Sequence, residues 1–362
     1  QFGLAFRYFS EALDTDFGFY AMNVHSNLPI VTGTKSVLDE ASLADTATAQ
    51  GAALAGIVAG SDGELTLDSA LAYLAINGDI LGVQGYTTEA ETASDDFGLG
   101  LTPGFSAMEP GTFFTEYVED TQIYGLSFAT NVATMAISGE VSHKRGIPLQ
   151  INSDQIITAG LVADIYLQSE TFGGSVEALT SFDQLLGDMA AIEDGGFSHS
   201  WREFDVSQVQ ITAIKLWDQV MGASRIAFVG EAGFTYVHEL DESDGAIKFR
   251  GGIVDSSVAY EDYVYENTTT ANSWGYTTRL VAQYNDVFAG VNVTPVLSYS
   301  QDVEGFSPAP GANFREGNET LGFSVNAEYQ DTYTAELSYK TKSGTGTSSD
   351  RDFAAMTIGM SF

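Results

Sequence analysis

The chain of 362 residues contains no cysteine, only 7 prolines and only 14 basic residues. The lack of cysteine excludes a disulfide scaffold, a zinc finger and a cysteine nucleophile. The 49 acidic residues give a formal charge of −35. Such a negative surface repels phosphate and argues against a nucleic-acid partner. A disordered acidic chain is excluded as well, because 12% of the residues are aromatic and 44% are hydrophobic.

Long hydrophobic runs are also missing. The longest uncharged stretch in the first third, 46–61 (TATAQGAALAGIVAGS), is short and partly polar. A membrane-spanning helix needs about 20 mostly apolar residues, so a helical membrane protein is excluded. No secretory signal precedes Gln1, and Gln1 is not an initiator methionine. We therefore expect a processed or incomplete N-terminus.

The chain instead shows an alternation of apolar and polar residues with period two, which predicts strands with one apolar face. The pattern is clear in 353–362, 332–342 and 319–329. Only a turn around Asp331 separates 319–329 from 332–342, so these two segments should form a hairpin. The predicted pairs on its apolar face are Tyr329–Tyr333, Ala327–Ala335, Val325–Leu337 and Phe323–Tyr339.

Similar alternation predicts about eleven strands in all. The other eight segments are 2–10, 16–24, 121–130, 133–143, 204–217, 224–239, 274–285 and 289–300. The connections between strands alternate strictly between short and long. The long ones are 25–120, 144–203, 240–273, 301–318 and 343–351. This regularity is typical of a transmembrane antiparallel up-and-down β-barrel, with short periplasmic turns and long extracellular loops.

The four longest connections hold 34 of the 49 acidic residues, so most of the negative charge is expected outside the bilayer. We predict a single outer-membrane barrel domain over 1–362. Within it, 25–120 should form a long, partly helical extracellular loop or cap, and 144–203 a second long loop. Segments 37–59 and 69–81 are rich in Ala, Leu and Asp and are expected to be helical.

The number of strands gives a further expectation. The last strand of such a barrel runs towards the periplasm, and counting back makes 2–10 run the same way. Bacterial single-chain barrels have an even number of strands, so at least one upward strand should precede residue 1. The complete barrel is expected to have about 12–16 strands, with about 14 favoured.

Three blocks resemble a known family, the domain of unknown function 1302 family of Gram-negative outer-membrane proteins. They are 17–29 (FGFYAMNVHSNLP), 116–152 (EYVEDTQIYGLSFATNVATMAISGEVSHKRGIPLQIN) and 298–319 (SYSQDVEGFSPAPGANFREGNE), in this order along the chain. The resemblance implies a role in handling hydrophobic compounds such as alkanes, sterols and lipids. It also implies a periplasmic lipoprotein and an inner-membrane transporter as partners, and supplies no catalytic residues.

Polar residues opposite the apolar faces are the candidates for lining a lumen, because Arg or Lys on the lipid side would cost about 2–4 kcal/mol at mid-bilayer. These candidates are Arg7, Glu140, Arg225, Glu231, Arg279, Asn326, Glu328, Glu336 and Lys340. They could line a permeation path or fill a narrow barrel as a structural network. Aromatic residues near strand ends suit interfacial anchoring. They are Trp217, Trp274, Tyr299, Tyr333, Tyr339 and Phe362.

Signals for chemistry are weak. The four histidines form no HExxH motif, and no GxSxG is present, so we predict no enzyme and no cofactor. Asp241 and Asp244 are weak candidates for Ca²⁺, since their loop lacks the spacing of a twelve-residue calcium loop. Loose Ca²⁺ or Mg²⁺ bridging between acidic loops and lipopolysaccharide phosphates is also expected.

Three functions remain open. The first is an outer-membrane channel or transporter for small hydrophobic molecules, passive and gated by loops. The second is a structural or surface-interaction protein whose acidic loops bind cations, outer-membrane lipid, lipopolysaccharide or another copy of the chain. The third is a barrel hydrolase, whose Ser, His and acid or amide would be assembled in space and leave no local signature.

Overall fold

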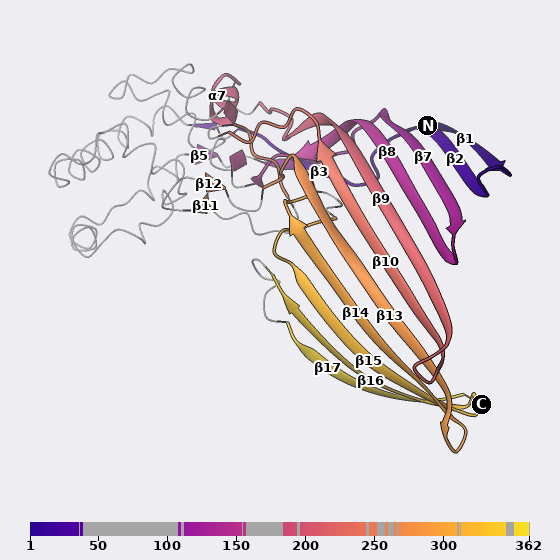
Figure 1. Ribbon diagram of the computed structural model, residues 1–362. Helices are drawn as coiled ribbons and strands as arrows, with labels where there is room; N and C mark the ends of the chain where they lie inside the picture. The colour runs from indigo at the N-terminus through magenta and orange to yellow at the C-terminus, as the bar shows by residue number, and fades with distance from the viewer. Residues whose placement is uncertain are drawn as a thin grey trace, which may run out of the picture.

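A computed structural model describes residues 1–35, 37–38, 108–109, 112–153, 155–156, 184–193, 196–243, 246–251, 258–259, 264–265, 268–309, 311, 313–344 and 351–361 (Figure 1). The protein is all-β and is built on one eleven-stranded antiparallel sheet. Its strands are β1 (Phe2–Ser10), β2 (Thr15–Val24), β7 (Thr121–Val132), β8 (Met135–Gln150), β9 (Trp201–Val220), β10 (Ala223–Val237), β13 (Asn272–Phe288), β14 (Val291–Glu304), β15 (Glu319–Tyr329), β16 (Tyr333–Ser343) and β17 (Phe353–Met360).

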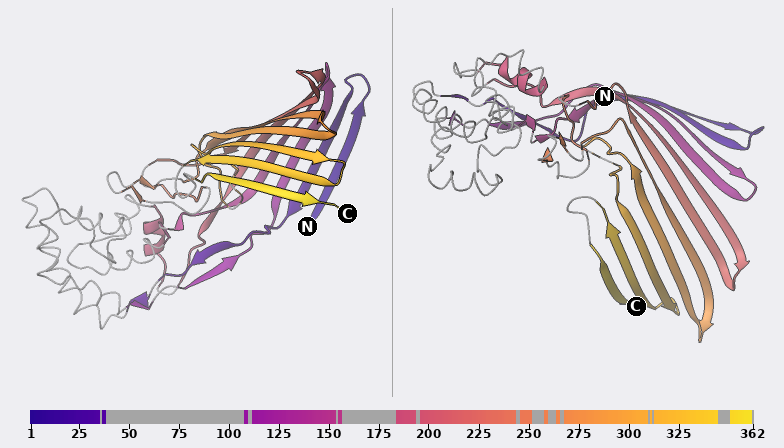
Figure 2. Two further views of the ribbon diagram at one scale, coloured as in Figure 1. Left: turned by 90° about the horizontal axis from the view of Figure 1, so that it is seen from below. Right: turned by 60° about the vertical axis from the view of Figure 1, so that its left-hand side comes forward.

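Each strand of the sheet pairs with the one before it, so the order in space follows the order in sequence. β1 and β17 are the two edges and do not pair with each other. Figures 1 and 2 show one curved layer of long strands with the two edges apart. Among the described residues, no helix has the length and apolar character needed to cross a membrane.

The predicted alternation of short and long connections is confirmed. Tight turns join β1 to β2, β7 to β8, β9 to β10, β13 to β14, and β15 to β16, all at one end of the sheet. These turns need residues with positive φ, for example Gly222 at 78° and Gly290 at 84°. The long connections therefore all leave from the opposite end.

The predicted hairpin register is confirmed as well. Val325 pairs with Leu337 and Phe323 with Tyr339 across β15 and β16. Because side chains alternate along each strand, this register gives the sheet one apolar and one polar face. We call them the outer face and the polar face. The central part of the outer face carries Phe6, Phe19, Leu126, Val141, Val209, Phe234, Leu280, Leu297, Phe323, Leu337 and Met356.

The main buried hydrophobic cluster lies at the long-connection end and not along the sheet. Leu149 and Ile151 pack there with Leu185 and Met189 of α7 (Gln184–Ala190). The spacing of four puts the two α7 side chains on one side of the helix. Short strands gather at the same end (Figure 2). They are β3 (Ile30–Gly33) with β6 (Phe113–Glu116), β4 (Val37–Leu38) with β5 (Met108–Glu109), and β11 (Val258–Ala259) with β12 (Val264–Tyr265).

Several predicted boundaries were wrong. The strand predicted over 133–143 continues to Gln150, so the second long loop starts later than 144. Its pairing with β9 shifts by one residue between Lys144 and Ile147, where Gly146 has φ of 67°. This bulge breaks the period-two pattern on which the prediction relied. Within 37–59, Val37–Leu38 forms strand β4 and not helix, and the rest of 37–59 and all of 69–81 lie outside the described residues.

Candidate functional site

The nine polar residues predicted to line a lumen share the polar face. Arg7 of β1 pairs with Gly18 of β2, which pairs with Ser127 of β7. Ser127 in turn pairs with Glu140 of β8. The same alternation puts all nine on this face, namely Arg7, Glu140, Arg225, Glu231, Arg279, Asn326, Glu328, Glu336 and Lys340.

The structure brings only some of these side chains into contact. The Tyr20 hydroxyl donates to the carboxylate of Glu140, reaching over β7, where Gly125 leaves space for its ring. Arg225 forms an ion pair of 2.8 Å with Asp218 near the tight turn. The carboxylate of Glu231 accepts a bond of 3.2 Å from Thr212. The polar face is thus partly cross-linked by its own side chains.

A cavity of about 330 Å³ lies on the polar face towards the long-connection end. Glu140 and Glu231 line it, and Phe314 reaches it from the connection between β14 and β15. A Cβ at Gly233 would lie 2.9 Å from the Phe314 ring, and one at Gly275 3.0 Å from it. The two glycines therefore leave the room that the aromatic ring needs. Sequence reasoning did not find Phe314, because contacts between a loop and a sheet have no periodic signature.

The predicted aromatic anchors that the structure describes all lie on the outer face. Trp217 and Tyr333 lie near the tight turns. Trp274, Tyr299 and Tyr339 lie closer to the long connections. Two of them form hydrogen bonds with acidic side chains at this end. Trp274 Nε1 donates to Glu304 (3.3 Å), and the Tyr339 hydroxyl donates to Asp352 (2.9 Å). Phe362 lies outside the described residues.

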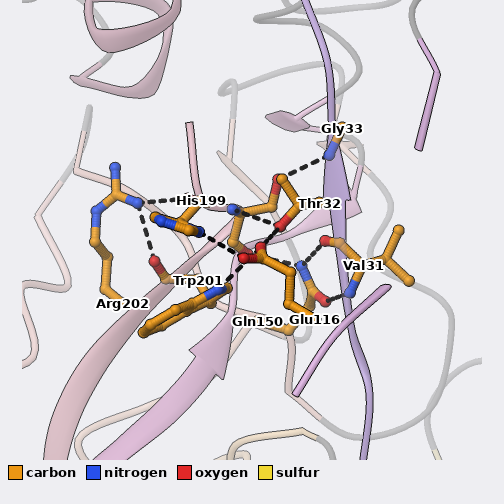
Figure 3. Close-up of polar contacts among 9 residues, drawn as sticks. Val31, Thr32, Gly33, Glu116, Gln150, His199, Trp201 and Arg202 are labelled. Carbon is orange, nitrogen blue, oxygen red and sulfur yellow. Dashed lines mark hydrogen bonds and ion pairs between the residues drawn. The ribbon is translucent and has the colours of Figure 1, made fainter. Parts of the chain in front are cut away.

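A polar network that sequence reasoning missed ties the long-connection end together (Figure 3). Its centre is Glu116, whose side chain is 18% exposed and whose Oε1 lies 2.7 Å from Nδ1 of His199. Trp201 Nε1 donates to the other carboxylate oxygen at 3.2 Å, and so does the buried Thr32 hydroxyl. Glu116 comes from β6, Thr32 from β3 and Trp201 from β9, which His199 precedes by two residues, so the network joins segments far apart in sequence.

Gln150 extends this network. Its Nε2 donates to the carbonyl oxygens of Val31 (3.0 Å) and Ser200 (2.7 Å), and its Oε1 accepts from the Val31 amide (2.8 Å). The Gln150 side-chain amide therefore pairs with Val31 of β3 in the way that the backbone of a neighbouring strand would. These bonds join β3, β6, β8 and the residues at the start of β9, so we call the network around Glu116 a structural clamp at the long-connection end of the sheet.

The predicted cation site receives little support. The Asp241 carboxylate accepts bonds from the Ser243 amide (2.9 Å) and hydroxyl (2.6 Å). These bonds lower the pKa of Asp241 below its ordinary value. Asp244 lies outside the described residues. In the described part of the chain, no group of three or more His, Asp or Glu could hold a metal ion.

Fold and site together define an all-β protein with a two-faced, eleven-stranded antiparallel sheet whose long connections all leave from one end. The chain belongs to the family described as protein of unknown function DUF1302, whose model matches residues 1–362. The resemblance inferred from three sequence blocks is thereby confirmed. A comparison with curated proteins gives no match.

Proposed function

We propose that the sheet is the wall of a transmembrane up-and-down β-barrel in the bacterial outer membrane. The barrel would be a passive, loop-gated channel for small hydrophobic molecules, such as lipids, alkanes or sterol-like compounds. The observation that carries the proposal is the outer face, which leaves large apolar side chains uncovered across all eleven strands. A layer of this size is unfavourable in water and favourable against hydrocarbon.

The exposure of central positions supports this setting. Val209, Leu297 and Phe323 are 44%, 46% and 47% exposed although they lie in the middle of the sheet. The edges alone thus do not account for the exposed apolar surface. The strands have 8 to 20 residues, and a tilted transmembrane strand needs about 9–11. The anchors at both ends of the outer face match two interfacial girdles.

The polar face supports a water-accessible interior. Arg279 and Lys340 lie on it, where a membrane-spanning barrel tolerates charge. Facing lipid, each would cost about 2–4 kcal/mol at mid-bilayer. A closed barrel leaves no free edge, so β1 and β17 would pair with each other or with intervening strands. A count of about 12–16 strands, about 14 favoured, remains our proposal for the closed wall.

The cavity beside Phe314 supports a gated route. Its walls combine an aromatic ring with the carboxylates of Glu140 and Glu231. This combination fits a permeant that has an apolar body and one uncharged hydroxyl that can donate to a carboxylate, such as a sterol-like compound or an oxidised alkane. The connection that carries Phe314 could narrow or widen the route without chemistry.

A second candidate is a structural or surface-interaction protein with the barrel as its anchor. The clamp around Glu116 favours it, because a rigid mouth suits docking better than gating. Its partners would be outer-membrane lipids, lipopolysaccharide phosphates bridged by Ca²⁺ or Mg²⁺, a further copy of the chain, or a periplasmic lipoprotein linked to an inner-membrane transporter.

Measuring the uptake of hydrophobic compounds distinguishes the channel from the interaction protein. A strain lacking the protein should take up a radiolabelled long-chain alkane or sterol more slowly, and the wild-type chain should restore the rate. Phe314→Ala should raise uptake, while Leu337→Ala on the outer face should leave it unchanged. Wild-type uptake in the deletion strain, together with lost Mg²⁺-dependent binding of lipopolysaccharide, would instead support the interaction protein.

A further inference from the structure

A serine and two histidines meet on the outer face near the long-connection end. Ser207 Oγ of β9 lies 3.0 Å from Nδ1 of His143 on β8. It also lies 2.8 Å from Nε2 of His238, which directly follows β10. The two imidazole rings are edge to face with centroids 5.5 Å apart. Since a hydroxyl has one proton, Ser207 can donate to only one of the two rings and must accept from the other.

A nearby acid favours one of the two assignments. Asp205 Oδ2 lies 3.7 Å from Nε2 of His143 and 3.7 Å from Nε of Arg145. The carboxylate is further held by the Gly146 amide, which donates to Oδ1 at 3.3 Å. The negative charge of the carboxylate favours the tautomer with its proton on His143 Nε2, and this tautomer leaves Nδ1 with a lone pair for the Ser207 hydroxyl. His238 then donates from Nε2 to Ser207 Oγ. The order acid, imidazole, hydroxyl is that of a serine nucleophile with its base.

The surroundings suggest what this group could act on. An open, mainly apolar groove of about 650 Å³ on the outer face is lined by Val209, Ile211, Ala232, Phe234 and Trp274, together with Gly233, Asn272 and Glu304. Val209 follows Ser207 by two residues on the same face, about 7 Å along the strand. The side chains of His143 and Asp205 are each 41% exposed, so the cluster is open to a ligand. An apolar groove beside an accessible serine fits an acyl chain next to its ester.

From this geometry we infer that the protein has a second activity, hydrolysis of acyl esters of lipids, with Ser207 as nucleophile and His143 as general base. Ser207 Oγ attacks the ester carbonyl carbon while its proton passes to His143 Nδ1. The intermediate expels the alcohol, which takes this proton, and leaves an acyl group on Ser207. Water attacks the acyl carbon and gives a proton to His143. The carboxylic acid leaves as Ser207 recovers its proton, so ester and water become acid and alcohol.

The remaining residues have supporting roles. Asp205 is a positioning residue that holds the tautomer of His143. His238 directs the Ser207 proton towards His143 by donating to the same oxygen. The inference uses the proposed function only for the membrane setting, since hydrolysis in detergent does not depend on conduction.

The full chain, purified in a non-ionic detergent, can be treated with a long-chain alkyl fluorophosphonate and digested for mass spectrometry. We expect the probe on Ser207 and no comparable labelling of Ser338 on the polar face. This part of the test needs no variant and so does not depend on how a variant folds. Absence of label on Ser207 would overturn the inference.

Hydrolysis of p-nitrophenyl laurate tests the roles. Ser207→Ala should reduce the rate to background, and His143→Gln should reduce kcat by about 100-fold or more. Asp205→Asn should lower kcat and leave KM unchanged, whereas Ser338→Ala should match the wild type. Circular dichroism verifies that each variant is folded. Equal rates in folded Ser207→Ala and wild type would refute the inference, even if the channel proposal held.

Discussion

Leu297 and Ser298 are neighbours in β14, yet they belong to opposite surfaces. Leu297 lies in a row with Leu280 and Phe323, while Ser298 lies between Arg279 and Gly322. Both residues are paired with β13 and with β15, so the difference lies in the side chains and in what surrounds them. A sheet of this kind is stable where its faces meet two different solvents, hydrocarbon on one and water on the other.

The largest effect is expected from placing the same charge on each face. Leu297→Arg should destabilise the protein in lipid vesicles by about 2–4 kcal/mol, because the guanidinium would face hydrocarbon at mid-bilayer. Ser298→Arg should cost less than about 1 kcal/mol, because in the proposed barrel the polar face lines a water-accessible interior. Urea titrations of tryptophan fluorescence give both values. Equal destabilisation by the two substitutions would remove the distinction between the faces.

An intermediate effect should come from crowding the polar face. Gly233→Ala brings a Cβ within 2.9 Å of the Phe314 ring. Such overpacking costs about 1–3 kcal/mol. Because the close atom is the tip of a side chain, Phe314→Ala should restore the stability of the Gly233 variant. A double-mutant cycle measures the coupling, and purely additive effects would show that Phe314 does not rest on Gly233.

A smaller effect is expected for the link between Tyr20 and Glu140. Tyr20→Phe removes one hydrogen bond to a carboxylate on a water-accessible face, which should cost about 1 kcal/mol. Tyr333→Phe is the matched change on the outer face and should alter stability less. Thermal unfolding of both variants in the same detergent compares them. A larger loss for Tyr333→Phe would contradict the assignment of the two faces.

The smallest effect concerns a residue on neither face. Asp241 has a pKa below its ordinary value in the folded chain because of Ser243. A depressed pKa gives stability that is present above the ordinary carboxyl pKa and is lost as pH falls through the folded value. Ser243→Ala removes the hydroxyl bond, so the pKa of Asp241 should move back up and stability at neutral pH should fall slightly. Carboxyl-selective NMR of labelled aspartate detects the shift, and an unchanged pKa would assign it to another cause.

The sequence predicted the sheet well because period two is a local property. The register of β15 and β16 followed from one turn and from which face was apolar. Prediction failed where a bulge shifted the pattern, as at Gly146, and β8 was therefore given too short a range. Bulges depend on the fit to a neighbouring strand, which a single sequence does not display.

The sites were predicted less completely, for a related reason. The nine polar-face residues were found by alternation, whereas Glu116 with His199, and Ser207 with His143, come from segments far apart in the chain. Their meeting depends on strand order and on the register between β8 and β9. Neither group has a local sequence motif, because a site of Ser, His and an acid is assembled in space from separate segments.

The absence of cysteine makes the most direct test simple, because single cysteines can be placed at each position from 293 to 300 in β14. In lipid vesicles, a membrane-impermeant maleimide should label 294, 296, 298 and 300 faster than 293, 295, 297 and 299. A lipid-attached quencher should affect a fluorophore at the second set only. Alternation of both signals is the result that a membrane-spanning, two-faced wall predicts, and uniform aqueous labelling along β14 would contradict it.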